Sequence, residues 1–204
     1  SEQDIKVAVI GLGYVGLPLA VAFGNRFPTL GFDINEARLQ NLKRNVDFNQ
    51  EVSTSELEKV INLTFTSDPS ELANYNVFIV TVPTPIDSHR NPDLTPLVLS
   101  SRTISKALKA GDIVIYESTV YPGAIEEVCV PILAEGSGLV FNQDFFAGYS
   151  PERINPGDKS KKLPDILKIT SGSTAAAGDF VDYLYKQIIT AGTHRVSSIQ
   201  VAEA

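Results

Sequence analysis

The sequence predicts an α/β fold in which helices cover both faces of a doubly wound, mainly parallel sheet. Short apolar runs alternate with helical segments along the 204 residues, as in strands joined by crossover helices. The first apolar run, 7–10, leads directly into Gly11, Gly13 and Gly16, a spacing typical of a strand, a tight turn and a helix. A second run ends at Asp33, where dinucleotide-binding folds carry an acidic residue. These observations indicate a Rossmann-like domain.

The composition is that of an ordinary globular chain, with 43% hydrophobic and 20% charged residues, enough for one sizeable core. A formal charge of -7 argues against sequence-independent binding to nucleic acid or anionic lipid. The basic cluster 159–162 is interpreted as a solvated loop face. No apolar run has the length that spans a bilayer, and the first residues lack a signal-peptide pattern. We therefore expect a cytoplasmic protein without membrane or nucleic-acid partners.

The strands are predicted from short apolar runs that Gly, Pro, Asp or Asn residues interrupt. They are expected at 7–10, 30–33, 63–66, 77–82, 113–116, 144–148, 166–171 and 194–196. Several of these runs are apolar throughout, which is typical of strands buried on both faces. The loop 149–164 is too long for a plain connection, so it is a candidate for function.

The helices are predicted where apolar residues recur at helical spacing. They are expected at 17–27, 35–45, 52–61, 94–108, 124–135 and 174–188, with a helical turn at 69–73 and a further helix starting after Ser198. The residues of the second helix that should face inward are Ala37, Leu39 and Leu42. Ser53 or Thr54, with Glu56 close behind, resembles a capping box at the start of the third.

Five segments follow predicted strands and should meet at one edge of the sheet, namely 11–16, Asp33, 83–85, 118–119 and 150–153. In parallel sheets, ligands bind beyond the carboxyl ends of the strands, where the strand order reverses. In the glycine turn, the first glycine allows the turn, the second lets the backbone approach a pyrophosphate, and the third lets the helix pack closely. The N–H groups at the start of that helix would face the phosphates.

Asp33 is predicted to bind the adenosine ribose rather than to serve as a plain turn residue. Its carboxylate can accept hydrogen bonds from both ribose hydroxyls. The same negative charge would repel a 2′-phosphate. The expected cofactor is therefore NAD rather than NADP.

Taken together, these segments resemble the amino-terminal domain of the nucleotide-sugar 6-dehydrogenases, the family of UDP-glucose dehydrogenase. The matching segments are 11–18, 33–35, 82–85, 92–94, 118–120 and 150–153. Segments 116–123 and 152–158 are most similar to the branch that acts on UDP-N-acetylhexosamines. Members of that branch make uronic acids for bacterial surface polysaccharides such as capsule and O-antigen.

The resemblance implies that two NAD molecules in turn oxidise the sugar C6 alcohol to a carboxylate, through a thiohemiacetal and a thioester on a cysteine. It implies that residues 1–197 form the NAD-binding domain and that 198–204 begin a connecting helix. The catalytic cysteine, its lysine and asparagine partners and the substrate domain would lie downstream. The 204 residues alone would then bind NAD without catalysis, and the whole protein would be a homodimer.

The resemblance also assigns individual residues to the cofactor. Besides the three glycines and Asp33, they are Tyr14, Val15, Arg38, Thr84, Thr119 and Arg153. Arg38 has an alternative interpretation as a solvated helix residue; if it reached a 2′-phosphate, the preference for NAD would weaken. Thr84 lies between two prolines, so the alternative there is a rigid loop.

Two residues are candidates for catalysis. The resemblance places Thr119 near the nicotinamide, where it would help to position water; the alternative is a helix cap near Gly123. Glu152 is expected to accept a proton from water that attacks the thioester, with a salt bridge to Arg153 as the competing interpretation. UDP-glucose dehydrogenases have a second glutamate where this chain has Pro156, so its role is unfilled or passes to Arg153.

Other reactive residues are expected to be structural. Cys129 lies on the apolar side of a predicted helix, where a free cysteine behaves as a core residue. His89 and His194 have no ligands at metal spacing, so no metal site is expected. Two alternative functions stay open: the same chemistry on UDP-glucose or GDP-mannose, and a dinucleotide-binding module that never catalyses.

Overall fold

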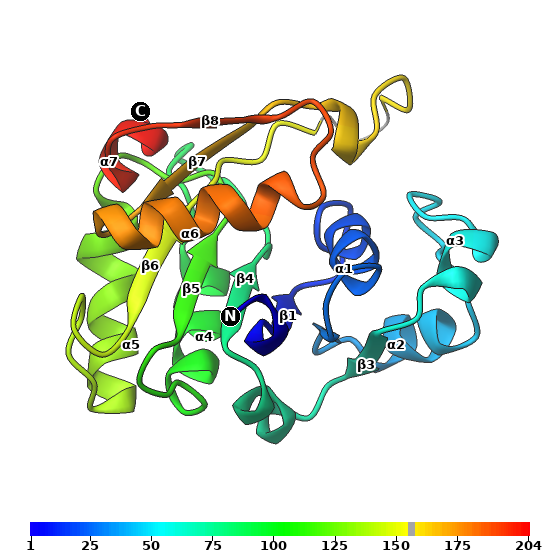
Figure 1. Cartoon of the computed structure of the whole chain (residues 1–204), viewed down its shortest axis with the longest axis horizontal. Helices are drawn as coiled ribbons and strands as arrows, with labels where there is room; N and C mark the ends of the chain where they lie inside the picture. Colours follow the sequence, from blue (N-terminus) through cyan, green and yellow to red (C-terminus); the bar gives the residue numbers. More distant parts are fainter. Residues whose placement is uncertain (155–157) are drawn as a thin grey trace.

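An eight-stranded sheet forms the centre of the computed structural model, which describes residues 1–154 and 158–204 (Figure 1). The strands are β1 (Val7–Ile10), β2 (Thr29–Phe32), β3 (Leu63–Thr66), β4 (Val77–Val80), β5 (Ile113–Tyr116), β6 (Phe146–Tyr149), β7 (Lys168–Gly172) and β8 (Thr193–Arg195). Their order in the sheet is β3-β2-β1-β4-β5-β6-β7-β8. The chain changes direction of winding between β1 and β4, and this switch point is where α/β sheets bind ligands.

The sheet is mainly parallel, as predicted, but β7 runs against β6. All neighbouring pairs from β3 to β6 are parallel, and so are β7 and β8. Parallel strands need a crossover connection, whereas the described residues between β6 and β7 form only the short 3₁₀ turn Leu163–Asp165. The chain therefore returns antiparallel, and β7 starts at the edge where β6 ends.

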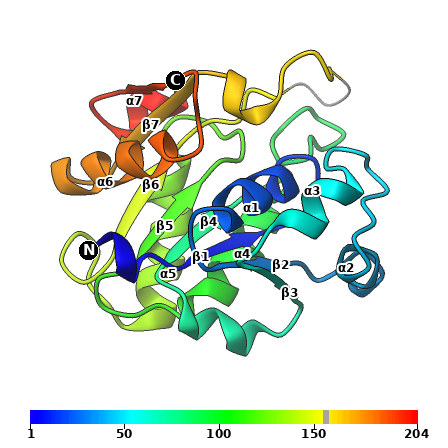
Figure 2. The same cartoon turned by 45° about the vertical axis from the view of Figure 1, so that its right-hand side comes forward.

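Helices cover both faces of the sheet (Figures 1 and 2). The α-helices are α1 (Gly16–Gly24), α2 (Glu36–Lys43), α3 (Thr54–Lys59), α4 (Thr95–Ser105), α5 (Val130–Ser137), α6 (Ala175–Lys186) and α7 (Ile199–Glu203). Side chains of α1 and α6 pack in one buried cluster with alternate residues of the sheet, and side chains of α4 and α5 pack in the other. Because both faces are covered, β1, β4 and β5 are buried along their whole length.

The predicted elements are present, with differences at particular residues. The helix expected over 124–135 begins with a π-helical turn, Ile125–Cys129, before α5. Pro131 follows this turn and has no N–H to donate to the preceding carbonyls, which disfavours regular α-helix there. The prediction that Ala37 faces inward is wrong, because it is exposed. The capping box between Ser53 and Glu56 is confirmed.

The five segments expected at one edge follow β1, β2, β4, β5 and β6, which all run parallel. Their placement along a single edge is therefore confirmed. No helix among the described residues is both long and apolar enough to cross a bilayer. A separate groove of about 290 Å³ lies where β4, β5 and β6 begin, against Phe146 and Phe180, so it is at the opposite edge of the sheet.

Candidate functional site

The glycine turn after β1 has a distinct geometry at each glycine. Gly11 has a φ of 92°, which favours glycine, and it turns the chain at the end of the strand. A Cβ on Gly16 would lie 1.7 Å from the Gly11 carbonyl oxygen and 2.5 Å from Thr81 Oγ1, so α1 packs directly on the turn. A Cβ on Gly13 would meet no atom within 4 Å. The turn thus leaves an open backbone surface at Gly13.

The first turn of α1 begins at this surface without a side-chain cap at its N-cap residue, Val15. Within that turn the Leu17 N–H donates to the Gly13 carbonyl at 3.2 Å, and Pro18 has no N–H. The neighbouring Tyr14 is 46% exposed. Because the positive end of the helix dipole favours anions, this end of α1 is suited to a pyrophosphate.

Asp33 ties the glycine turn to the segment after β2. Its Oδ2 accepts a hydrogen bond from the Leu12 N–H at 2.8 Å, and its Oδ1 accepts one from the Asn35 N–H at 2.9 Å. The Asn35 side chain in turn caps α2 by accepting the Arg38 N–H. Since an ionised carboxylate has about four acceptor positions, Asp33 retains acceptor capacity for the two hydroxyls of a ribose.

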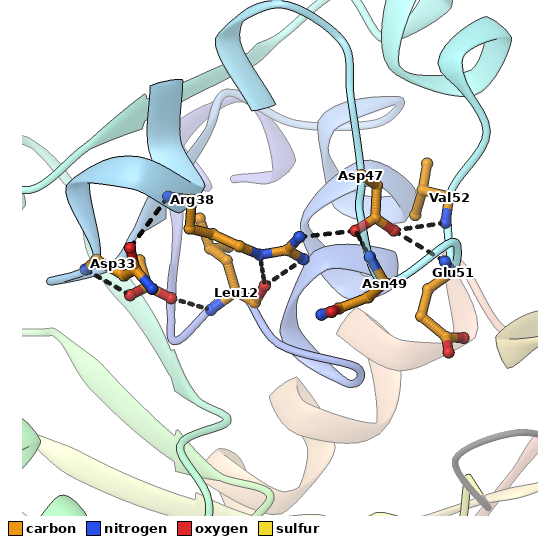
Figure 3. A network of polar contacts seen from close by, with 8 residues as sticks. Leu12, Asp33, Arg38, Asp47, Asn49, Glu51 and Val52 are labelled. Atoms are coloured by element: carbon orange, nitrogen blue, oxygen red, sulfur yellow. Dashed lines mark hydrogen bonds and ion pairs between the residues drawn. The ribbon is translucent and has the colours of Figure 1, made fainter. Parts of the chain in front are cut away.

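Arg38 is not a solvated helix residue, so that alternative is wrong. Its side chain is 13% exposed. The Nε and Nη2 groups donate to the Leu12 carbonyl at 2.9 and 2.7 Å, and Nη1 donates to Asp47 Oδ1 at 2.7 Å (Figure 3). Both the N–H and the carbonyl of Leu12 are therefore held, one by Asp33 and the other by Arg38.

The loops after β4 and β5 are joined to each other. Ser118 Oγ donates to the Val82 carbonyl at 2.6 Å, and the Tyr149 hydroxyl donates to the Ser118 carbonyl at 3.0 Å. The Oγ1 atom of Thr84 is buried and has no hydrogen-bond partner among the described residues. A buried hydroxyl without a partner costs free energy, so this atom is suited to meet a ligand.

Thr119 is exposed. The helix that starts near Gly123, which Thr119 was a candidate to cap, is capped by Glu203 instead. Glu203 of α7 accepts hydrogen bonds from the backbone N–H groups of Gly123 and Ile125, the latter at 3.1 Å. Burial raises the pKa of this carboxyl above its ordinary value. The capping interpretation of Thr119 is therefore wrong, and the residue is exposed at the site edge.

The ionic partner of Glu152 is Lys168 and not Arg153, which the sequence had suggested. Its Oε2 lies 3.7 Å from the Lys168 ammonium, while Arg153 is exposed. The Oε1 atom accepts the Ile154 N–H. At 3.7 Å the ammonium attracts Oε2 without a hydrogen bond, and the buried Oε2 has no hydrogen-bond partner in residues 1–154 and 158–204. Pro156, where a family glutamate is missing, lies outside the described residues.

Glu152 is part of a buried ionic cluster, which we call the Glu117 cluster. Its members are Glu117, Glu152, Lys168 and Tyr185. Lys168 Nζ donates to Glu117 Oε1 at 2.7 Å, and the Tyr185 hydroxyl donates to Glu117 Oε2. The side chain of Glu117 is 0% exposed and that of Lys168 is 5% exposed. Burial raises the pKa of Glu117 to about 7, with a further contribution from Glu152 that the Lys168 ammonium opposes.

The raised pKa of Glu117 predicts a pH-dependent stability. Below pH 4.5, the ordinary pKa that we assume for the unfolded chain, the carboxyl is protonated in both the folded and the unfolded state, and its contribution to stability is fully present. This contribution is lost as the pH rises through the folded pKa of about 7. Relative to the variant Glu117→Gln, the free energy of unfolding of the unmodified chain should therefore fall between about pH 4.5 and 7. Urea denaturation of both chains across this range measures the difference, and a constant difference would contradict the assignment.

Cys129 is buried, as expected. Burial raises the pKa of its thiol to about 11, so it is protonated at neutral pH and unsuited to act as a nucleophile. No group of three His, Cys, Asp or Glu residues in the described part of the chain is arranged to hold a metal ion.

Three residues of this edge, Asp47, Glu117 and Lys168, were not identified from the sequence. Glu117 carried a signal, because a charged residue directly follows a fully apolar strand and would end up buried. Lys168 reaches the site only through the reversed direction of β7. The contacts of Asp47 depend on the conformation of the loop after α2, which no sequence motif predicts.

The comparisons with known proteins agree with this geometry. Residues 5–189 match the family described as "UDP-glucose/GDP-mannose dehydrogenase family, NAD binding domain". The chain is 62% identical over 202 residues to a UDP-N-acetyl-D-glucosamine 6-dehydrogenase of Pseudomonas aeruginosa, covering 99% of this chain and 48% of the relative. It is 56% identical to a protein of the same name in Salmonella typhi, with the same coverage.

A solved structure of UDP-D-ManNAc dehydrogenase from Pyrococcus horikoshii matches with a TM-score of 0.89 and 30% identity, over 98% of this chain and 48% of that one. The chain thus spans about half the length of the curated relatives it matches. The family match extends over most of the 204 residues, from β1 to the end of α6. The chain therefore belongs to the UDP-glucose/GDP-mannose dehydrogenase family and provides its NAD-binding domain.

Proposed function

We propose that the protein containing this chain oxidises the C6 alcohol of a UDP-N-acetylhexosamine to the uronic acid with two NAD. Relatives at 62% and 56% identity carry the name UDP-N-acetyl-D-glucosamine 6-dehydrogenase, which supports N-acetylglucosamine as the hexosamine. The product would serve a bacterial surface polysaccharide such as capsule or O-antigen. We further propose that the enzyme is a cytoplasmic homodimer without nucleic-acid or membrane partners.

The observation that carries this proposal is the convergence of two kinds of groups on one sheet edge. The glycine turn and Asp33 offer donors and acceptors suited to a dinucleotide. Beside them, Thr84 Oγ1 and Glu152 Oε2 are buried polar atoms that lack hydrogen-bond partners within the described residues. Buried polar atoms normally have partners, so these two favour a ligand that supplies them.

When bound, NAD supplies the acceptor for the hydride that leaves the sugar carbon. The chain's own residues bind and orient it. The start of α1 holds the pyrophosphate, and Asp33 holds the adenosine ribose. The further cofactor contacts that we propose are Tyr14, Val15, Arg38, Thr84, Thr119 and Arg153.

Glu152 and Thr119 are the catalytic residues that we propose in this chain. Glu152 Oε2 would accept a proton from the water that releases the acid, since it is an acceptor with no hydrogen bond of its own in the described structure. The hydroxyl of Thr119, which is an exposed residue, would orient that water. Residues 1–197 would form the NAD-binding domain and 198–204 the start of a connecting helix, with the catalytic cysteine and the substrate domain in the remaining length of the protein.

Cofactor binding is tested by calorimetric titration of the 204-residue chain. We expect NAD to bind weakly and NADP more weakly still, and equal affinities would remove the role of Asp33. The variant Asp33→Asn should weaken NAD binding about tenfold, because charge-assisted hydrogen bonds to the ribose are lost. Asp68→Asn is the control, since Asp68 caps a 3₁₀ turn after β3 and asparagine caps equally well.

The reaction is tested with the longer protein and a panel of nucleotide sugars, by following NADH absorbance. The proposal requires two NADH per UDP-N-acetylhexosamine, and one NADH per sugar would indicate an enzyme that releases the aldehyde. Preference for UDP-glucose or GDP-mannose would change the substrate and leave the reaction class. No NADH with any sugar, together with tight NAD binding, would indicate a non-catalytic module.

A further inference from the structure

Asp47 lies in the loop after α2, and its side chain is 0% exposed. Its carboxylate accepts backbone N–H groups from Asn49 at 3.0 Å, Glu51 at 2.8 Å and Val52 at 3.0 Å (Figure 3). The fourth hydrogen bond comes from Arg38 Nη1 at 2.7 Å. The guanidinium and the backbone N–H groups hold the pKa of Asp47 below its ordinary value although burial opposes them. Asp47 is thus an ionised acceptor built into the loop.

Arg38, the partner of Asp47, is linked to Asp33 through the backbone of Leu12. Arg38 bonds the carbonyl of Leu12, and Asp33 bonds the N–H of the same residue (Figure 3). In dinucleotide-binding folds that take NADP, an arginine near the end of the second strand accommodates the 2′-phosphate. Here it is neutralised by Asp47 and directed towards a backbone carbonyl.

We propose that Asp47 is a specificity-determining residue for the cofactor and acts through Arg38. By engaging the guanidinium, Asp47 deprives the ribose site of a positive charge for a 2′-phosphate. Asp33 then faces the 2′-hydroxyl of NAD without a competing cation. This inference rests on the proposed ribose site at Asp33. It explains why an arginine beside that site need not favour NADP.

The experiment measures the dissociation constants of NAD and NADP for the chain and its variants by calorimetry. In Asp47→Asn, Arg38 loses its ionic partner, so the ratio of the NADP constant to the NAD constant should fall about tenfold. The gain should disappear in the double variant Asp47→Asn/Arg38→Gln, which lacks the guanidinium. The control Glu58→Gln removes the same charge from an exposed position on α3 and should leave the ratio unchanged.

Asparagine keeps one of the two side-chain oxygens, which can still accept the Glu51 and Val52 N–H groups, so Asp47→Asn should fold with reduced stability; circular dichroism melts check this. If it does not fold, Asp47→Ser replaces it, since a hydroxyl still accepts one loop N–H. An unchanged ratio in the folded variant, or a gain that persists without the guanidinium, would overturn the inference. If the unmodified chain bound neither NAD nor NADP, the ribose site at Asp33 would itself be wrong and the inference would fall with it.

Discussion

Replacing Gly16 with alanine is expected to unfold the glycine turn and abolish NAD binding. The added Cβ would lie 1.7 Å from the Gly11 carbonyl oxygen, which is a backbone atom and cannot rotate away. That oxygen also accepts a hydrogen bond from Thr81 Oγ1 at 2.7 Å, so moving it separates the turn from β4. Overpacking usually costs about 1–3 kcal/mol, and we expect about 3 kcal/mol or more here. Urea denaturation and calorimetry with NAD measure the two effects.

The matched control is Gly13→Ala in the same turn. A Cβ at Gly13 meets no atom within 4 Å, so the free energy of unfolding should change by less than about 0.5 kcal/mol. NAD binding should still weaken by tenfold or more, because the methyl group occupies the surface where the pyrophosphate approaches. Equal losses of stability in both variants would contradict the separate roles of the two glycines. Unchanged NAD affinity in Gly13→Ala would contradict the proposed path of the cofactor.

Lys168→Met is expected to be the most destabilising change in the Glu117 cluster. The substitution leaves the Glu117 carboxylate buried without its cation. Removing one partner of a buried ion pair costs about 3–5 kcal/mol. The loss should be smaller at pH 6 than at pH 8, since a protonated Glu117 no longer needs the ammonium. Urea denaturation at the two pH values measures both the size and the pH dependence.

Lys186→Met is the control for this prediction. Lys186 on α6 pairs with Asp182 at 2.8 Å, but its side chain is 57% exposed. Exposed pairs contribute about 0–1 kcal/mol, so this variant should lose little stability at either pH. A loss in Lys168→Met no larger than that in Lys186→Met would mean that the cluster does not depend on its cation.

The sequence was sufficient for the parts of the fold that repeat a local pattern. The run 7–10 and the run 113–116 are apolar throughout, and both form central strands that are buried on both faces. The glycine spacing predicted the turn and the close packing of α1, because these depend on the absence of a side chain. Placement of five segments at one edge followed from parallel strand order alone.

The missed features depend on contacts that are distant in sequence or on loop conformation. Lys168 reaches Glu117 because β7 is antiparallel to β6, and no local pattern sets that direction. Asp47 acts through a loop in which Asn45 and Gln50 have φ values of 62° and 55°. Since such turns combine common polar residues in many ways, the sequence of this loop did not indicate an arginine partner.

Glu203 connects α7 to the segment that follows β5, at the edge of the sheet where the glycine turn lies. Its carboxylate accepts two backbone hydrogen bonds, from the N–H groups of Gly123 and Ile125, in the segment that continues from Thr119. Because these two hydrogen bonds join α7 to the N-terminus of the π-helical turn Ile125–Cys129, the position of α7 restrains the segment that follows Thr119.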